Sequence, residues 1–318
     1  MNIKNLVKNR IKYFNRYFPK LENQDKQLLG RVNSLREKGY LVLDQYITGD
    51  DLEALQILYK NKLEIELKFE MPCLSQSSID EIKHKELIDN YFCYKPSDLV
   101  DHNLTFDRSN FSNYEDCLDK FKPSTLKTYL TDIQEFYKVW LDEDLLRIIE
   151  TYMGVRPHLV EAYLRRNFPA KYKVMNHFWH RDTNHPDFLL KVFIFLSDCD
   201  ISNGPHEYIS QSLQDDRLRG KRYFSETEVD SVYPIDSPQR IKSVVKAGTV
   251  VIEDTRGLHR ATIPKEGYRD LGFAVFLPLS VFSRTLIPLY KIDQKIYHNL
   301  SKIQKSYIPN QNISKSIF

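Results

Sequence analysis

The second half of the chain consists of short apolar runs separated by turn signals, and this pattern restricts the fold more than any other feature. From residue 155 onward the runs are rich in β-branched and aromatic residues: HLVEAYLRRNF, YKVMNHFWH, FLLKVFIFL, TVVIED and LGFAVFLPL. Breaks such as NFPA, SNGP, KAG and KEG lie between them. Many short strands at this spacing are typical of an antiparallel sandwich or barrel.

The first half shows helical spacing instead. One apolar face ends at Gly39, and a short strand, YLVLDQYI, follows it. The next helix is expected to be capped by Asp50 or Asp51. Residues 124–152 predict one or two long helices that end at Gly154. The apolar face of that segment comprises Leu126, Leu130, Ile133, Tyr137 and Trp140.

Composition and charge exclude several classes of protein. Hydrophobic residues make up 42% of the 318, which predicts a sizeable core. The net charge of +3 gives no case for nucleic acid as a partner. No apolar run approaches the roughly 20 residues of a membrane-spanning helix. The four cysteines form no CxxC pair, and without a signal peptide we expect free thiols in a soluble, cytoplasmic protein.

Residues 1–21 carry six basic side chains and no acidic one, with apolar residues at helical spacing. A basic amphipathic helix of this kind can make peripheral contact with an anionic membrane. The commoner role is packing on its own domain or on a partner chain, and we expect that role here. The sequence carries no signal for an oligomeric state.

The stretch FWHRDTNHPDF contains a His-Arg-Asp motif that also occurs in protein kinases. A kinase places Asn five residues after the Asp, but this chain has Asp187 there. It also lacks a Gly-rich loop, a VAIK motif and Asp-Phe-Gly. The kinase interpretation is therefore excluded.

A metal site fits the same motif better. Residues two apart on a strand share a face, so His180 and Asp182 can present an imidazole and a carboxylate together. His259 is the most suitable third ligand, because it follows a buried-type strand and a turn that contains glycine. Two histidines and one carboxylate with open positions are typical of non-heme Fe(II) oxygenases. Arg269 lies ten residues further on and can bind a carboxylate through two parallel hydrogen bonds.

Four segments, in this order, resemble the phytanoyl-CoA dioxygenase family of Fe(II)/2-oxoglutarate oxygenases: FWHRD, LLKVFIFLSDCDISNGPHEYI, GTVVIEDTRGLHRAT and YRDLGFAVFLP. The segment LREKGYLVLDQYITGDDLEAL is similar to the usual opening of the family, so the likeness covers most of the chain. It implies a mainly β protein with α-helices, whose double-stranded β-helix, a jelly-roll or cupin-like core, is flanked by N-terminal helices.

The resemblance also implies roles for particular residues. His180, Asp182 and His259 match the iron ligands, and Arg269 matches the residue that binds the C5 carboxylate of 2-oxoglutarate. Asn167 lies thirteen residues before His180 and matches a co-substrate-binding Asn of the ectoine hydroxylase branch. The implied activity uses Fe(II), 2-oxoglutarate and O2 to hydroxylate an unactivated C–H bond of a small molecule, and it releases succinate and CO2. Related halogenases lack the carboxylate ligand, so Asp182 favours hydroxylation.

Several alternatives stay open at this point. Lys191 either faces the co-substrate or lies at a sheet edge where its ammonium reaches water. Arg269 either binds the co-substrate or forms a salt bridge with Asp270 or another neighbour. Residues 210–213 read SQSL where the family commonly has PGSH, which puts the local turn in doubt. The competing functions are a non-catalytic jelly-roll binding or scaffold protein and a cupin-type metalloenzyme that does not use 2-oxoglutarate.

We expect a single oxygenase domain over residues 25–283, with a helical half at 25–154 and the jelly-roll core at 155–283. A basic amphipathic extension at 1–24 precedes it, and a C-terminal helical tail at 284–318 follows. The last dozen residues are polar, and we expect them to be loose. Substrate determinants are expected at about 66–125 and 210–240.

Overall fold

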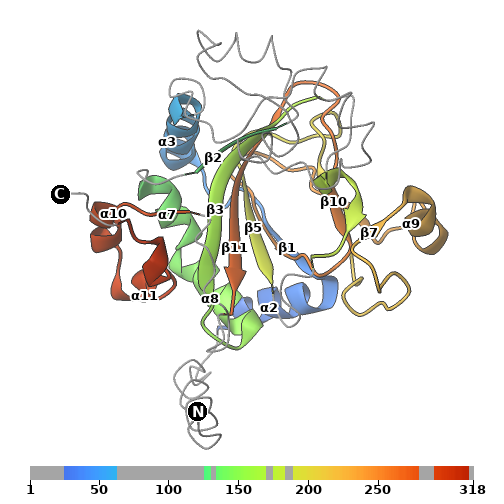
Figure 1. Cartoon of the computed structure of the whole chain (residues 1–318), viewed down its shortest axis with the longest axis horizontal. Coiled ribbons are helices and arrows are strands. Elements are labelled where there is room, and N and C mark those ends of the chain that lie inside the picture. Colours follow the sequence, from blue (N-terminus) through green and yellow to red (C-terminus); the bar gives the residue numbers. More distant parts are fainter. Residues whose placement is uncertain are drawn as a thin grey trace, which may run out of the picture.

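Two antiparallel sheets form the body of the protein (Figure 1). The computed structural model describes residues 25–62, 125–129, 134–169, 175–182, 189–278 and 290–314. Within these ranges the larger sheet has the strand order β1-β9-β5-β11-β3-β2 and the smaller sheet has the order β7-β4-β10-β6-β8. The basic segment 1–21 and most of the region 66–125 lie outside the described residues.

The larger sheet consists of β1 (Tyr40–Leu43), β9 (Val250–Asp254), β5 (Leu190–Phe195), β11 (Arg269–Leu277), β3 (His158–Asn167) and β2 (Thr125–Tyr129). The smaller sheet consists of β7 (Tyr223–Phe224), β4 (Trp179–His180), β10 (His259–Ala261), β6 (His206–Ile209) and β8 (Arg240–Lys242). Successive strands alternate between the sheets from β3 to β6 and again from β8 to β11. This winding is a jelly roll, which confirms both the antiparallel sandwich predicted from the strand pattern and the core that the family resemblance implies.

Side chains alternate across the larger sheet, and each face has its own apolar cluster. On β11, Leu271, Phe273 and Val275 belong to the cluster that faces the smaller sheet. Ala274 and Phe276 belong to the cluster on the opposite face, which packs against helices. The period of two along a strand therefore separates a helix-covered core from the interior between the sheets.

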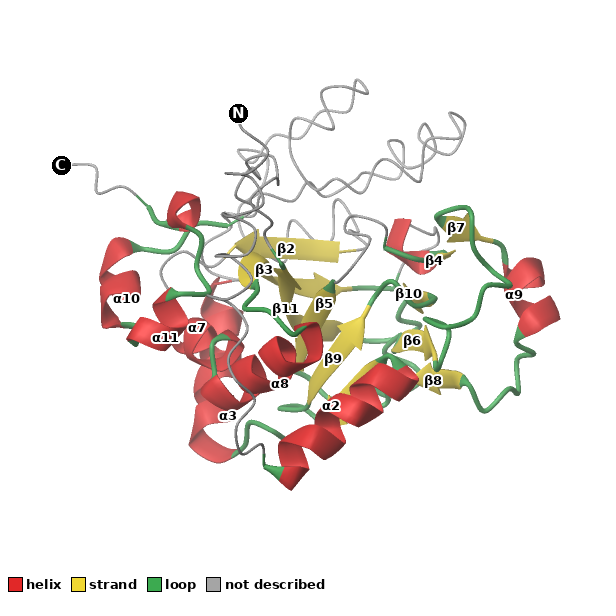
Figure 2. Cartoon of the chain, turned by 90° about the horizontal axis from the view of Figure 1, so that it is seen from below, coloured by secondary structure: helices red, strands yellow, loops and turns green. Residues whose placement is uncertain are grey.

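Helices cover the outer face of the larger sheet, as Figure 2 shows. They are α2 (Lys26–Lys38), α3 (Gly49–Lys60), α7 (Gln134–Trp140), α8 (Glu143–Met153), α10 (Gln294–Asn299) and α11 (Lys302–Lys305), while α9 (Glu226–Val232) lies beside the smaller sheet. In α8 the Asp142 carboxylate accepts hydrogen bonds from the backbone N–H groups of Asp144 and Leu145. Gly154 ends the helix at φ 68°, as predicted.

Two local predictions about secondary structure are wrong. Thr125–Tyr129 is strand β2, not helix, because it pairs with the edge of β3, where Thr and Tyr residues are favoured. Helix α3 begins at Gly49, after Thr48, so Asp50 and Asp51 lie in its first turn instead of capping it. Carboxylates in a first turn still interact favourably with the positive end of the helix dipole.

The expectation of a loose end is also wrong for residues 307–314. Tyr307 and Ile308 are buried in the outer core, and the Tyr307 carbonyl accepts a hydrogen bond from the Leu159 N–H at 2.8 Å. The Tyr307 hydroxyl donates to the Glu150 carboxylate, and the Arg156 guanidinium lies 5.4 Å from the Tyr307 ring centre. The tail is thus attached to α8 and β3. No helix in the described ranges is both long and apolar enough to cross a membrane.

Candidate metal centre

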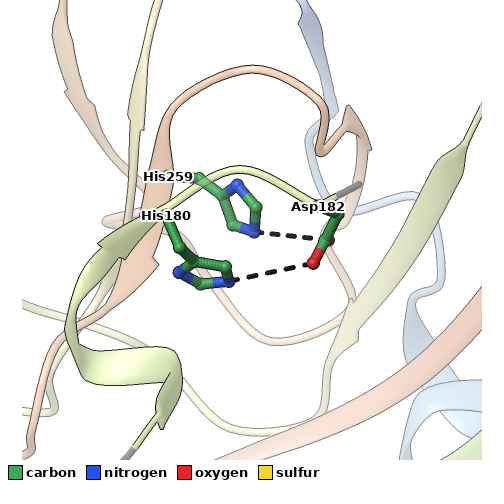
Figure 3. Close-up of side chains that lie close together, drawn as sticks. All are labelled: His180, Asp182 and His259. Atoms are coloured by element: carbon green, nitrogen blue, oxygen red, sulfur yellow. Dashed lines mark ion pairs between the residues drawn. The ribbon is translucent and has the colours of Figure 1, made fainter. Parts of the chain in front are cut away.

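The three predicted ligands meet between the sheets. His259 opens β10 and pairs in register with His180 on β4, and Asp182 follows two residues after His180. His180 Nε2 lies 4.0 Å from Asp182 Oδ1, and His259 Nε2 lies 3.6 Å from Asp182 Oδ2 (Figure 3). Each residue offers a ligand atom, and these atoms all lie within 4.8 Å of one another. The cluster is large enough for one metal ion and all three side chains are buried.

Backbone carbonyls fix the orientation of both imidazoles. His180 Nδ1 lies 2.8 Å from the Phe178 carbonyl oxygen, and His259 Nδ1 lies 3.0 Å from the Gly257 carbonyl oxygen. A carbonyl can only accept, so each Nδ1 carries the hydrogen and donates it. Each Nε2 therefore keeps its lone pair and points toward Asp182, as a metal ligand requires.

The protonation states also suit a divalent cation. Burial lowers the pKa of His180 to about 4 and, together with the neighbouring His180, lowers the pKa of His259 well below its ordinary value. Burial alone would raise the pKa of Asp182, but the Lys191 ammonium and the two imidazoles outweigh it and lower that pKa. The site thus presents two neutral imidazoles and one carboxylate, which are the ligand forms that bind a metal.

Lys191 interacts directly with this carboxylate. Its Nζ lies 2.5 Å from Asp182 Oδ2 and its side chain is 17% exposed. Lys191 stands on β5, which lies between β9 and β11, so the alternative of an edge position is wrong. The ammonium also lies 5.4 Å from the Phe273 ring centre.

Arg269 is fully buried on the face of the larger sheet that points toward the smaller sheet. It stands opposite Asn167 in the β11–β3 register, and its Nη2 donates a hydrogen bond to Asn167 Oδ1 at 3.3 Å. Its Nε and Nη1 have no hydrogen-bond partner among the described residues. Burial and the nearby Arg165 guanidinium lower the pKa of Arg269 to about 9, so it is charged at neutral pH. The sequence predicted both residues, and the structure places them in contact.

The alternative salt bridge from Arg269 to Asp270 does not form. Asp270 points to the opposite face of β11, where Arg166 binds it through two hydrogen bonds of 2.7 and 2.8 Å. Tyr59 on α3 donates a further hydrogen bond to Asp270 at 3.1 Å. Consecutive residues of a strand face opposite sides, so the two neighbours cannot share a partner.

Two residues that sequence reasoning missed support the segment before His259. The Tyr208 hydroxyl donates to the Asp254 carbonyl at 2.9 Å and packs on Gly257, where an added Cβ would lie 1.9 Å from it. Asp254 is also bound by Arg256 and by the Tyr152 hydroxyl at 2.8 Å. The glycine in TRGLH was the only sequence signal for this close approach.

Arg181 organises the segment whose sequence departs from the family pattern. Its guanidinium donates to the Ser212 and Leu218 carbonyls at 2.9 and 2.8 Å. The Ser212 hydroxyl oxygen accepts a hydrogen bond from the Leu258 N–H at 2.8 Å. The turn at 210–213 is therefore well connected, and it braces the residue directly before His259.

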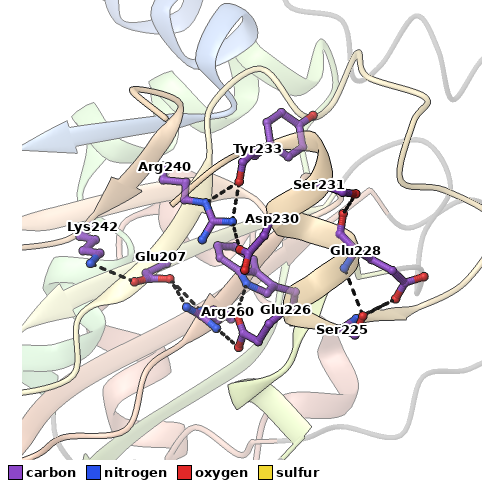
Figure 4. A network of polar contacts seen from close by, with 11 residues as sticks. Glu207, Ser225, Glu226, Glu228, Asp230, Ser231, Tyr233, Arg240, Lys242 and Arg260 are labelled. Atoms are coloured by element: carbon purple, nitrogen blue, oxygen red, sulfur yellow. Dashed lines mark hydrogen bonds and ion pairs between the residues drawn. The ribbon is translucent and has the colours of Figure 1, made fainter. Parts of the chain in front are cut away.

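Arg260 and Arg256, the other arginines near His259, are occupied elsewhere. Arg260 binds Glu207 at 2.7 Å and also Glu226, on the far side of the smaller sheet (Figure 4). Its guanidinium lies 4.4 Å from the Trp179 ring centre. This network attaches α9 to the sheet. His206, another histidine near the site, lies 2.8 Å from Glu253, whereas His185 lies outside the described residues.

No protein-family model matches this chain, and no curated protein matches its sequence. Solved structures do match it. SnoK, a non-heme α-ketoglutarate-dependent carbocyclase from nogalamycin biosynthesis, is 16% identical with a TM-score of 0.50, over 81% of this chain and 85% of SnoK. HygX from Streptomyces hygroscopicus, solved with nickel, 2-oxoglutarate and hygromycin B, is 14% identical with a TM-score of 0.47, over 86% of this chain and 92% of HygX. The match to SnoK shows that the chain has the fold of that protein, which confirms the resemblance seen in its sequence at the level of the fold.

Proposed function

We propose that this chain is a non-heme Fe(II)/2-oxoglutarate-dependent dioxygenase that hydroxylates an unactivated C–H bond of a small molecule. One observation carries the proposal. A buried His-Asp-His cluster shares the interior of the jelly roll with a buried guanidinium, Arg269, that has no carboxylate partner among the described residues. A metal site and an anion site within one interior are what a chelating 2-oxo diacid requires.

The donor set fits Fe(II). His180, Asp182 and His259 would hold the ion from one side and leave positions open, which is the 2-His-1-carboxylate arrangement. A structural zinc site would instead be closed by a fourth protein ligand, and no fourth ligand belongs to this cluster in the described part of the chain. When bound, Fe(II) supplies the redox chemistry that couples O2 and the conversion of 2-oxoglutarate to succinate and CO2 to oxidation of the substrate.

The protein's own residues bind the co-substrate, orient the metal ligand Asp182 and exclude water from the interior. Arg269 binds the C5 carboxylate of 2-oxoglutarate with its free Nε and Nη1 donors, and Asn167 holds the guanidinium in place through Nη2. Lys191 keeps Asp182 ionised and oriented. The apolar side chains of the interior, such as Phe193 and Phe273, keep water out.

Hydroxylation is the outcome that we propose among several that this fold supports. SnoK is named a carbocyclase, so the fold by itself does not set the product. The carboxylate ligand Asp182 favours hydroxylation over halogenation, because it fills the position that a halide would take. The substrate is proposed to be a small molecule.

Anaerobic visible absorption tests the proposal. Fe(II) and 2-oxoglutarate are added to metal-free protein separately and then together, and we expect a weak charge-transfer band only when both are present. Arg269→Met should still bind Fe(II) but lose the band at 2-oxoglutarate concentrations that saturate the native protein. Arg217→Met is the matched control, since this exposed arginine lies outside the interior and should keep the band.

Each negative outcome is distinct. Failure to bind Fe(II) would overturn the enzyme proposal and favour a non-catalytic jelly-roll protein. Iron binding without the band would indicate a cupin-type metal site that does not use 2-oxoglutarate.

A further inference from the structure

A second buried guanidinium, Arg165, lies in the interior next to the proposed co-substrate site. It stands on β3 two residues before Asn167 and opposite Leu271 of β11. Its neighbours Leu164 and Arg166 face the helices, so strand alternation turns Arg165 toward the smaller sheet. The guanidinium lies 5.8 Å from the ring centre of Phe273, a member of the interior cluster.

Arg165 lacks an anionic partner in the part of the chain that the structure describes. The residue is 6% exposed, and among the described residues its Nε has no hydrogen-bond partner and its guanidinium forms no ion pair. Two other pairs of interior groups already face one another, since Lys191 binds Asp182 and Glu253 lies 2.8 Å from His206, whereas Arg269 also has no carboxylate partner among the described residues. A buried, unpaired guanidinium is costly to the fold, so its retention points to a ligand that supplies the missing anion.

One diacid does not account for both arginines. The proposed function assigns the C5 carboxylate of 2-oxoglutarate to Arg269, and the other end of the molecule to the metal. Arg165 stands one step along the inner face of β3 from Asn167, about 7 Å away at the rise of a strand. Its charge also lowers the pKa of Arg269, so a ligand that neutralised only Arg269 would leave a buried cation beside it.

We propose that Arg165 binds a carboxylate of the substrate, which makes the substrate an organic acid. This inference rests on the proposed function. A single carboxylate matches the single charge of Arg165 and accepts two parallel hydrogen bonds from a guanidinium. A phosphate monoester would bring up to two negative charges to one cation. Tyr163 and Phe273, whose ring centres are 4.5 Å apart, give the acid an apolar and aromatic surface on the same face.

The test uses full-length protein loaded with Ni(II), as a redox-inert substitute for iron, and with 2-oxoglutarate. Benzoate is the probe, benzamide is its neutral isostere, and isothermal titration calorimetry measures both. We expect benzoate to bind more tightly than benzamide. Arg165→Met should weaken benzoate binding by roughly tenfold or more and leave benzamide unchanged. Arg165→Lys keeps the charge without the planar fork, so its benzoate affinity should be intermediate.

Two further measurements separate a binding role from a structural one. Arg165→Met should raise the thermal midpoint of the ligand-free protein, because it removes a buried charge that has no partner. Its affinity for 2-oxoglutarate should stay within about twofold of native, whereas Arg269→Met should lose that affinity. A fall in the thermal midpoint with no effect on benzoate would show a structural role and overturn the inference.

Other results would also overturn it. These are equal affinity for benzoate and benzamide in the native protein, loss of 2-oxoglutarate binding in Arg165→Met, and tighter binding of inorganic phosphate than of benzoate. Failure of the proposed function looks different, because the native protein would then bind no 2-oxoglutarate before any benzoate is added.

Discussion

At the residue scale, burial has opposite effects on the pKa values of the candidate metal ligands: it lowers those of the two histidines and acts to raise that of the aspartate. The same desolvation that keeps His180 and His259 neutral would also neutralise Asp182 if Lys191 were not beside it. The ion pair of Asp182 with Lys191 preserves the carboxylate in a place where an isolated charge would not persist. The pKa of Asp182 in the folded protein lies below the ordinary value of an aspartate. The ion pair therefore stabilises the metal-free fold at pH values above the ordinary pKa, and this stabilisation is lost as the pH falls through the lowered pKa.

Changing Asp182→Asn should therefore have two effects. Metal binding should be lost, and the metal-free protein should lose up to about 3 kcal/mol of stability, because the Lys191 ammonium is left nearly buried without a partner. The double change Asp182→Asn with Lys191→Met should recover most of the stability but not the metal binding. Urea unfolding and metal titration measure the two effects. A double variant no more stable than Asp182→Asn would contradict the pairing.

Arg269→Met should be more stable than the native protein in the absence of ligands. The guanidinium is fully buried with only one hydrogen bond, and its pKa is lowered to about 9, which means that the fold disfavours its charge. A methionine of similar length removes that cost. Differential scanning calorimetry of the ligand-free proteins checks this. In a second scan of Ni(II)-loaded protein, adding 2-oxoglutarate should raise the midpoint further only for the native chain.

At the element scale, the approach of Tyr208 to Gly257 sets the position of β10. Gly257 does not need a left-handed backbone; it needs the absence of a Cβ, which would lie 1.9 Å from the Tyr208 hydroxyl. The Gly257 carbonyl also orients His259. The contact of Tyr208 on β6 with the turn before β10 thus determines where the His259 imidazole lies.

Gly257→Ala should lower both stability and metal affinity, because either Tyr208 or the turn must move. We expect a loss of about 1–3 kcal/mol, as for overpacking, and a metal affinity at least tenfold weaker. The matched control is Gly30→Ala on α2, where nothing lies within 4 Å of an added Cβ. That change should be neutral or stabilising by up to about 1 kcal/mol. Unchanged metal binding in Gly257→Ala would show that the turn does not position His259.

At the scale of the whole molecule, helices and tail cover one sheet so that the opposite face is free to form the interior site. Helices and strands from both halves of the chain share the outer core. The C-terminal segment contributes Tyr290, Ile292, Ile296, Leu300, Tyr307 and Ile308 to it. The site itself lies on the other face, so the outer core determines stability without touching the ligands.

Tyr307→Ala should destabilise the fold by about 3–5 kcal/mol, the range for removing a buried aromatic side chain. It also leaves Glu150 without its tyrosine partner. The metal affinity of the folded fraction should remain native, because Tyr307 belongs to the outer core. Ile303→Ala is the control, since Ile303 is 49% exposed and should change stability little. Chemical denaturation and metal titration test both; weakened metal binding in folded Tyr307→Ala would contradict the separation of the two faces.

The sequence by itself determined the strand-rich half and the presence of His180 and Asp182 two residues apart, and its resemblance to a known family pointed to His259 and Arg269. The strands and the His180–Asp182 pair follow from local rules, namely turn residues between apolar runs and a period of two along a strand. Only the tertiary structure decided that Thr125–Tyr129 is a strand, since its partner β3 lies about 40 residues away in the sequence. It also decided that Tyr307 is buried, that Lys191 meets Asp182, and that Arg165 lies unpaired beside Arg269. These contacts depend on which residues, far apart in the sequence, are buried next to one another after folding. The spacing of residues along the chain does not determine that.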